Sequence, residues 1–276
     1  MVKMATVWDR TAEFLSDNIA AIVPIALLAF FVPASIEGNF EAAMTGAGPG
    51  LTALLSGLKI VFALVSLWGS LAITAMALDI ASERSAANIA TRRFLPALVV
   101  WLVMFAGAAL LVLPIPAVLT FNGYDMAAIA NRETVEMSRS MAWFIGIYLV
   151  ALTIFLLWVL ARLIVATPVV VRENRVLSAF GQSWSLTRGT ALRIVGVILL
   201  YAIVSMVAGL AAKTVFGSIF TLVAGNDGGV TLASVMTSIV VAAVQSAFMV
   251  ISPAFTAKLY LALTAQAGFR HGETAV

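Results

Sequence analysis

Six basic side chains in this chain are spaced so that together they could bind an anion. Five are arginines between positions 162 and 193 and the sixth is a lysine further along: Arg162, Arg172, Arg175, Arg188, Arg193 and Lys258. A guanidinium can bond two phosphate oxygens at once, whereas an ammonium acts as a point charge. Basic residues next to long apolar segments attract anionic headgroups at the membrane boundary. The six residues therefore predict a site for an anionic lipid headgroup.

Arg162 and Lys258 differ from the other four because they lie inside apolar segments. A charge within the hydrocarbon region is costly, so such a side chain pairs, lines a polar cavity or extends to the headgroups. Asp79, at the end of another apolar segment, is a candidate partner for both. Two alternatives to an anion site stay open: snorkelling for Arg162 and Lys258, and ordinary topology-setting charge for the other four.

Residues for catalysis or metal binding are sparse. The chain has no Cys and one His, His271, which lies in a polar tail without a partner motif. The common catalytic, nucleotide-binding and metal-ligand motifs do not occur in the sequence. The glycine-rich segments 46–50 and 224–229 are typical of turns. We therefore expect no catalytic residue, no metal site and no cofactor.

The segments that position these residues are long and apolar. The chain of 276 residues is 62% hydrophobic and 11% charged, whereas soluble domains are about half apolar and about a quarter charged. Apolar runs of about 20 residues are long enough to cross a bilayer as helices. The sequence predicts one all-α integral membrane domain over residues 1–276, with spans at 19–36, 51–79, 95–113, 141–165, 190–216 and 232–263.

Three stretches, 7–28, 85–105 and 178–200, share one design: a short polar or amphipathic helix, a polar corner, then a span. Because each unit adds two spans, the short helices should all lie at one membrane surface. We therefore expect three helical-hairpin repeats, each preceded by an interfacial helix on the cytoplasmic side. The third of these membrane-interface helices has an apolar face made of Val176, Leu177, Phe180 and Trp184. Its opposite face consists of Arg175, Ser178, Gln182 and Ser185, which should be exposed to water.

The distribution of charge predicts the topology. Six spans leave both termini on one side, and that side carries all but four of the 16 Lys and Arg residues. Since basic residues concentrate in cytoplasmic segments, both termini are expected in the cytoplasm. The N-terminal segment is acidic as well as basic, which is typical of a retained helix rather than a cleaved signal. The four exceptions are Lys59, Arg132, Arg139 and Lys213.

A motif in the third unit resembles one known family. The residues that carry it are Ala179, Ser183, Trp184, Leu186, Thr187 and Gly189, supported by Arg162, Thr167-Pro168 and the segment LPIP at 113–116. This pattern is similar to the membrane domain found in some glycerophosphoryl diester phosphodiesterases and in stand-alone bacterial proteins. The resemblance implies a multi-pass helical protein of the bacterial cytoplasmic (inner) membrane. In fused members a separate soluble domain carries the phosphodiesterase chemistry, and its His and carboxylate motifs do not occur here.

These observations predict a non-enzymatic module that binds anionic lipid, or a membrane or cytoplasmic partner protein, at the cytoplasmic leaflet. The alternative is a transporter of a small or lipid-like solute, based on Arg162, Lys258 and the spans interrupted by proline. A large polar cavity at mid-membrane would favour transport, whereas a groove open to the inner leaflet would favour lipid binding. The lipid bilayer is the expected partner, and no nucleic acid is expected.

Overall fold

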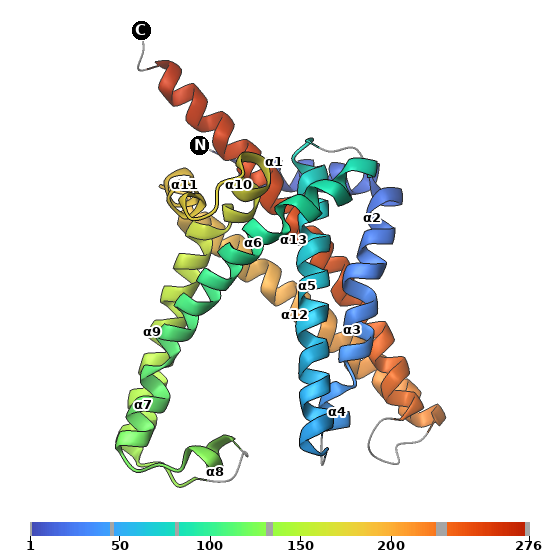
Figure 1. Cartoon of the computed structure of the whole chain (residues 1–276), viewed down its shortest axis with the longest axis vertical. Coiled ribbons are helices and arrows are strands. Elements are labelled where there is room, and N and C mark those ends of the chain that lie inside the picture. The colour runs from blue at the N-terminus through green and yellow to red at the C-terminus, as the bar shows by residue number, and fades with distance from the viewer. Residues whose placement is uncertain (1, 45–46, 81–82, 131–134, 225–230, 274–276) are drawn as a thin grey trace.

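A computed structural model of the chain consists of helices (Figure 1). It describes residues 2–44, 47–80, 83–130, 135–224 and 231–273, without the side chains of 41–42, 83–84, 130, 224 and 269–273. Arg132 and the side chain of His271 lie outside the described part. No strand occurs in the described residues, and the predicted all-α class is confirmed. The elements are α1 Met4–Asp17, α2 Ile19–Ala26, the π-helix η1 Leu27–Phe31, α3 Val32–Glu37, α4 Phe40–Met44, α5 Pro49–Ala77, α6 Glu83–Val112, α7 Pro114–Phe121, α8 Met126–Ala130, α9 Arg139–Leu163, α10 Ala166–Glu173, α11 Ser178–Leu186, α12 Ala191–Ala224 and α13 Leu232–Glu273.

Six helical segments in the described part are long and apolar enough to cross a membrane, as the sequence predicts. Each overlaps one predicted span, and several extend beyond it because a neighbouring helix continues the apolar run. The segments are Ile19–Glu37, Pro49–Ala77, Ser85–Phe121, Arg139–Glu173, Ala191–Val223 and Leu232–Gly268.

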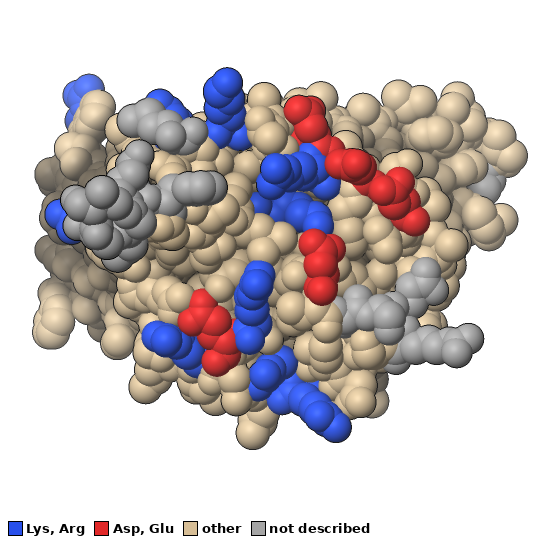
Figure 2. Space-filling model, turned by 90° about the horizontal axis from the view of Figure 1, so that it is seen from above, with Lys and Arg blue, Asp and Glu red and all other residues tan. Residues whose placement is uncertain are grey.

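The spans diverge from one common end of the molecule (Figure 1). Helix α13 packs against α1, α3, α5 and α12, while α6 leaves α5 and α10 and descends on the same side as α9. Both termini lie at the common end, together with α1, α10 and α11. Viewed from above, this end shows neighbouring basic and acidic side chains (Figure 2). We call it the charged end: α1, α10, α11 and the adjoining ends of α5, α6 and α13.

The packed core lies close to the charged end. Its largest continuous part is the buried run 71–78 at the end of α5, which meets 165–171 around the start of α10 and 254–263 of α13. Val7 and Phe14 of α1 close this core from the surface. Further from the charged end, α6, α9 and α12 turn many large apolar side chains outward. Acyl chains can cover such surfaces in a membrane, so these helices need little protein packing there.

The π-helix η1 marks the closest packing between the first two spans. Pro33 has no N–H, so the carbonyl of Ala29 loses its usual helical donor. The hydroxyl of Ser66 donates to that carbonyl at 2.8 Å. A side chain at Gly69 would overlap Ala29, so glycine permits this approach. Ser66 and Gly69 therefore both serve the close packing of these two helices.

The prediction of a separate surface helix in the second unit is wrong. The sequence predicts a polar helix before a corner at 91–93, but α6 continues through this region to Val112 and contains Pro96. Proline removes one helical hydrogen bond, and a buried stripe along the helix holds both sides of it together. Trp68 also donates to Thr91 at 3.1 Å. The stripe consists of Ala86, Ala90, Ala97 and Val100.

The predicted end of the third span at Leu113 is also too early. Pro114 begins a new helix, α7, because proline is tolerated in the first helical turn. The apolar segment then continues to Phe121. The second unit therefore begins and ends differently from its prediction, and the three-hairpin repeat stays a prediction.

Candidate functional site

A large groove separates α6 from α9 and is covered at one end by α11. Its volume is about 850 Å³. Of the lining side chains, Thr153 carries a hydroxyl, which donates to the carbonyl of Leu149 at 2.8 Å. The groove is therefore almost entirely apolar. Its walls include Val103, Gly107 and Leu111 of α6, Leu156, Leu160 and Leu163 of α9, and Phe180, Gly181 and Trp184 of α11.

The dimensions of this α6–α9 groove match one membrane leaflet. From Thr153 to Leu163 the wall formed by α9 extends about 15 Å at a rise of about 1.5 Å per residue. Half of the hydrocarbon core of a bilayer is also about 15 Å. Away from the charged end, the two walls are joined where the Tyr148 hydroxyl donates to the Leu111 carbonyl at 2.7 Å. At the charged end α11 lies over the groove.

Arg162 lies at the charged end of the groove, between two tryptophans. Its guanidinium carbon is 5.6 Å from the ring centre of Trp158 and 5.0 Å from that of Trp184. The two rings meet edge to face at 5.0 Å. Such cation–π contacts contribute about 0.5–2 kcal/mol, more when they are desolvated. The cation is thus held by aromatic faces, one of which also lines the groove.

The hydrogen bonds of Arg162 leave part of its guanidinium free. Nη1 donates to the carbonyl of Trp184 at 3.2 Å. Nε is buried, and it has no hydrogen-bond partner within the described residues. Buried N–H groups are normally satisfied, so the buried Nε lacks an acceptor that it would normally have.

The docking of α11 explains why small and hydroxyl residues recur in its motif. Helix α9 ends at Leu163, so the carbonyl of Arg162 is one of the terminal acceptors without a helical partner. Ser183 and Thr187 donate their hydroxyls to this carbonyl at 2.8 and 3.1 Å. Ala179, on the same face, is fully buried. The residues that carry the family resemblance therefore attach α11 to the end of α9.

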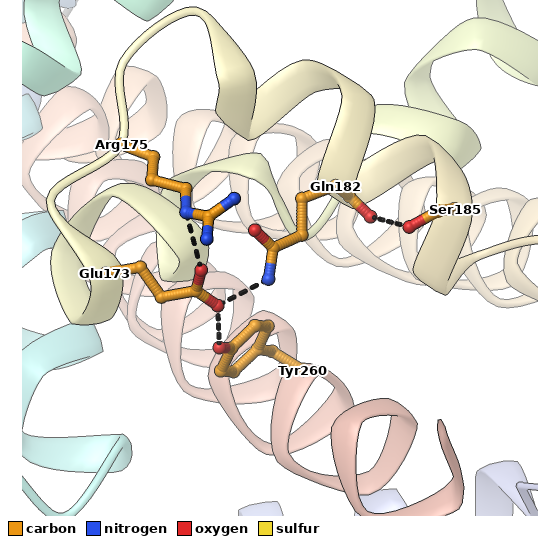
Figure 3. Close-up of polar contacts among 5 residues, drawn as sticks. All are labelled: Glu173, Arg175, Gln182, Ser185 and Tyr260. Atoms are coloured by element: carbon orange, nitrogen blue, oxygen red, sulfur yellow. Dashed lines mark hydrogen bonds and ion pairs between the residues drawn. The ribbon is translucent and has the colours of Figure 1, made fainter. Parts of the chain in front are cut away.

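A second set of bonds ties α11 to α10 and α13 through one carboxylate (Figure 3). Glu173 Oε1 accepts from the Tyr260 hydroxyl and from Gln182 Nε2, both at 2.6 Å. Glu173 Oε2 pairs with Arg175 Nε at 3.1 Å. Asn174, with φ 57°, adopts the left-handed conformation that turns the chain between the two helices. This carboxylate is the main polar connection between the third surface helix and the last span.

The structure places the apolar face of α11 differently from its prediction. Phe180 and Trp184 line the groove, and Phe180 and Val176 pack against the core. Leu177 instead points outward, with 62% of its surface exposed. Gln182 was expected to be exposed, and this is wrong, because it is half-buried and bonded to Glu173. The true docking face is the one formed by Ala179, Ser183 and Thr187.

The six predicted basic residues do not gather around one point. Arg175 pairs with Glu173, and Arg172 lies 6.0 Å from the ring centre of Tyr260. Lys258 pairs with Asp79 at 3.4 Å, as the sequence suggests, whereas Arg162 lies against tryptophans instead. The other two are also separate, since Arg188 is exposed in the turn after α11 and Arg193 lines a cavity beside Lys3 and Met4.

Three residues of this region were not predicted from the sequence: Trp158, Glu173 and Tyr260. Trp158 lies four residues before Arg162 on α9, a spacing that places both on one helix face and could have indicated the contact. Glu173 and Tyr260 are 87 residues apart, and no local pattern connects them. Within the described part of the chain, no group of three or more His, Cys, Asp or Glu residues is placed to hold a metal ion.

An all-helical chain with six membrane-length helices and an apolar groove between two of them is a polytopic helical membrane protein. The chain belongs to the family described as a domain of unknown function (DUF7847), whose family model matches residues 9–265. No curated protein and no solved structure matches it. The resemblance to the membrane domain of glycerophosphoryl diester phosphodiesterases stays a prediction.

Proposed function

We propose that this protein is a non-enzymatic membrane module that holds one anionic phospholipid in the leaflet next to the charged end. An acyl chain occupies the α6–α9 groove and the headgroup lies beside Arg162. The observation that carries the proposal is the continuity between a leaflet-long apolar groove and a caged guanidinium with an unpaired Nε.

The groove suits an acyl chain better than any polar solute. Its lining is apolar along its length, and Gly107 leaves open space in the wall formed by α6. A polar solute would lose its hydration there without gaining partners. A lipid tail loses nothing, since it moves from one apolar environment to another. Transport of a small polar solute, the alternative, would require a polar cavity at this depth, so the apolar lining supports lipid binding.

The charge at the end of the groove favours an anionic headgroup. The aromatic rings hold the guanidinium at the end of the groove, and a guanidinium can bond two phosphate oxygens at once. A phosphate would supply an acceptor for the buried Nε only if the side chains that cover this atom move aside on binding. Trp184 touches both the groove and Arg162, so it would separate the acyl chain from the headgroup.

The proposal is tested with two independent substitutions in the purified full-length protein. Arg162→Gln removes the cation, and Gly107→Phe fills the groove where no neighbouring atom lies within 4 Å. Each should lower the occupancy of phosphatidylglycerol, measured by native mass spectrometry, by about tenfold, the loss expected for about 1.4 kcal/mol. Lys213→Gln, on the far part of α12, is the matched control. Unchanged occupancy in both test variants would end the proposal.

The orientation is a second part of the proposal: the charged end faces the bacterial cytoplasm, with both termini there. It is supported by the concentration of Lys and Arg at that end and by the positive-inside rule. Reporter fusions at Gly48 and Gly123, in two loops at the opposite end, should both report outside. An inside signal at Gly123 would contradict the orientation of α6 and α9.

A further inference from the structure

A second cavity at the charged end is polar and is separate from the α6–α9 groove. Its volume is about 320 Å³, and it lies among α1, the end of α5 and α13. Asp17 lies two residues before the first span and Asp79 two residues after the second, so the cavity lies at the level of lipid headgroups. Its charged lining consists of Arg10, Glu13, Asp17, Asp79 and Lys258.

Helix α1 supplies one wall of the cavity with its polar face, because its apolar face packs against the bundle. Val7, Thr11 and Phe14 are buried against the bundle, and Trp8 lies 4.8 Å from Phe255 of α13 between ring centres. This docking turns the opposite face toward the cavity. On that face Arg10, Glu13 and Asp17 follow one another at helical spacings of three and four residues.

Lys258 supplies the opposite wall. Its side chain is 12% exposed, and its ammonium lies 4.9 Å from the ring centre of Phe14. Nζ is 3.4 Å from both carboxylate oxygens of Asp79, longer than the roughly 2.8 Å of a strong charge-assisted bond. An ammonium has three donors. Lys258 can therefore bond another oxygen while it keeps its contact with Asp79.

The backbone at Asp79 is held in an unfavourable conformation. Its φ is 57°, the left-handed region in which residues other than glycine are strained. Helix α5 ends two residues earlier, and the amide of Asp79 donates to the Met76 carbonyl at 3.0 Å. This turn directs the carboxylate to the rim of the cavity, where 71% of it is exposed.

The charges of the lining select the kind of ligand. Two cations and three carboxylates give a formal charge of −1. A purely anionic headgroup would meet the surplus carboxylate, and a purely cationic group would meet Arg10 and Lys258. A group that carries both signs satisfies both walls. A quaternary ammonium prefers aromatic faces, but Lys258 already occupies the face of Phe14.

We propose that this cavity binds a zwitterionic headgroup that contains a phosphodiester and a primary ammonium. The phosphate lies between Arg10 and Lys258, and the ammonium donates to Glu13 and Asp17. The ligand is either a phosphatidylethanolamine of the surrounding leaflet or free glycerophosphoethanolamine. This site does not share a lining residue with the α6–α9 groove, so the two proposals can fail separately.

Native mass spectrometry of the full-length protein in detergent tests the proposal, with phosphatidylethanolamine, phosphatidylcholine and phosphatidylglycerol added in equal amounts. The double variant Glu13→Gln/Asp17→Asn should lower phosphatidylethanolamine occupancy by about tenfold, the loss expected when bonds to charged groups are removed. Phosphatidylglycerol occupancy should stay unchanged. Asp9→Asn is the matched control, since Asp9 is exposed on α1 outside the cavity.

Two further measurements distinguish the membrane lipid from the free headgroup compound and test whether a loss of binding comes from misfolding of the variant. Free glycerophosphoethanolamine that displaces the lipid identifies a headgroup site open to the soluble form; lack of displacement assigns the site to the membrane lipid. Lys258→Met should also reduce phosphatidylethanolamine occupancy, with the control variant unaffected. Equal retention of phosphatidylethanolamine and phosphatidylcholine, or unchanged occupancy in the double variant, would overturn the proposal.

Discussion

Arg162 and Lys258 lie near the same end of the bundle, and both place a cation against aromatic rings, yet their surroundings differ. Arg162 lies between Trp158 and Trp184 at the end of an apolar groove. Lys258 pairs with Asp79 in a small cavity that carries more acidic than basic groups. The depth of a cation in a span therefore does not determine which ligand it can bind. The ligand depends on the charges of the neighbouring elements, which differ between Arg162 and Lys258 and divide one predicted anion site into two different sites.

The largest expected effect comes from Glu173→Ala, which should weaken the docking of α11 over the α6–α9 groove and leave the polar cavity unchanged. The change removes the acceptor of Tyr260 and Gln182 and the partner of Arg175, so we expect a loss of about 3 kcal/mol in the free energy of unfolding. Because the chain has no Cys, a label on Gly181→Cys can report the docking of α11 by its exposure to water.

The control for this change is Ser185→Ala, since the Ser185 hydroxyl donates to the Gln182 carbonyl within α11 itself. It should leave the exposure of the label unchanged. Retained phosphatidylethanolamine together with lost phosphatidylglycerol would support two separate lipid sites. An equal loss of both lipids, or a label that stays protected in Glu173→Ala, would contradict this separation.

Trp184→Ala should have the next largest effect. It removes one face of the cage around Arg162 and the edge-to-face contact with Trp158, so we expect a loss of about 2 kcal/mol in the free energy of unfolding. Leu177→Ala is the matched control, because Leu177 directly precedes the same helix but points outward. Denaturant unfolding in detergent measures both. An equal loss of stability in the two variants would show that the aromatic contacts of Arg162 add nothing to the stability beyond buried apolar area.

A smaller effect should distinguish two substitutions of Asp79. Both Asp79→Ala and Asp79→Gly lose the pair with Lys258, which contributes under about 1 kcal/mol because the carboxylate is exposed. Glycine also relieves the left-handed backbone, so the Gly variant should be the more stable by about 1 kcal/mol. Thermal unfolding of the two variants in one detergent tests this. A more stable Ala variant would be inconsistent with strain at this turn.

The smallest expected effect is a difference in salt dependence. Asp79→Asn should cost a few tenths of a kcal/mol in low salt and nothing measurable in about 1 M salt, since exposed pairs are screened. The cost of Arg162→Gln should depend less on salt, because its guanidinium is held by cation–π contacts and a bond to a backbone carbonyl, not by an exposed ion pair. Unfolding at two ionic strengths measures both. Parallel behaviour of the two variants would remove the distinction between an exposed ion pair and a cation held by aromatic rings.

Much of the framework was predictable from local patterns. The six spans and α11 follow from apolar length and helical periodicity. The pairing of Lys258 with Asp79 was also expected, because each lies near the end of an apolar segment. Other features were not predictable, such as the continuity of α6 through Pro96, which depends on a buried stripe packed against neighbouring helices.

The sequence by itself determined which segments enter the membrane, because the transfer of an apolar helix depends on its own composition and length. Only the tertiary structure decided which groups each cation meets. Lys258 and Asp79 are 179 residues apart, and the Arg162 carbonyl accepts from hydroxyls more than 20 residues away. Such contacts depend on how helices pack, and electrostatic interactions fall off with distance in space, whatever the separation along the chain. The two sites therefore exist only once α1, α11 and α13 meet the ends of α5 and α9.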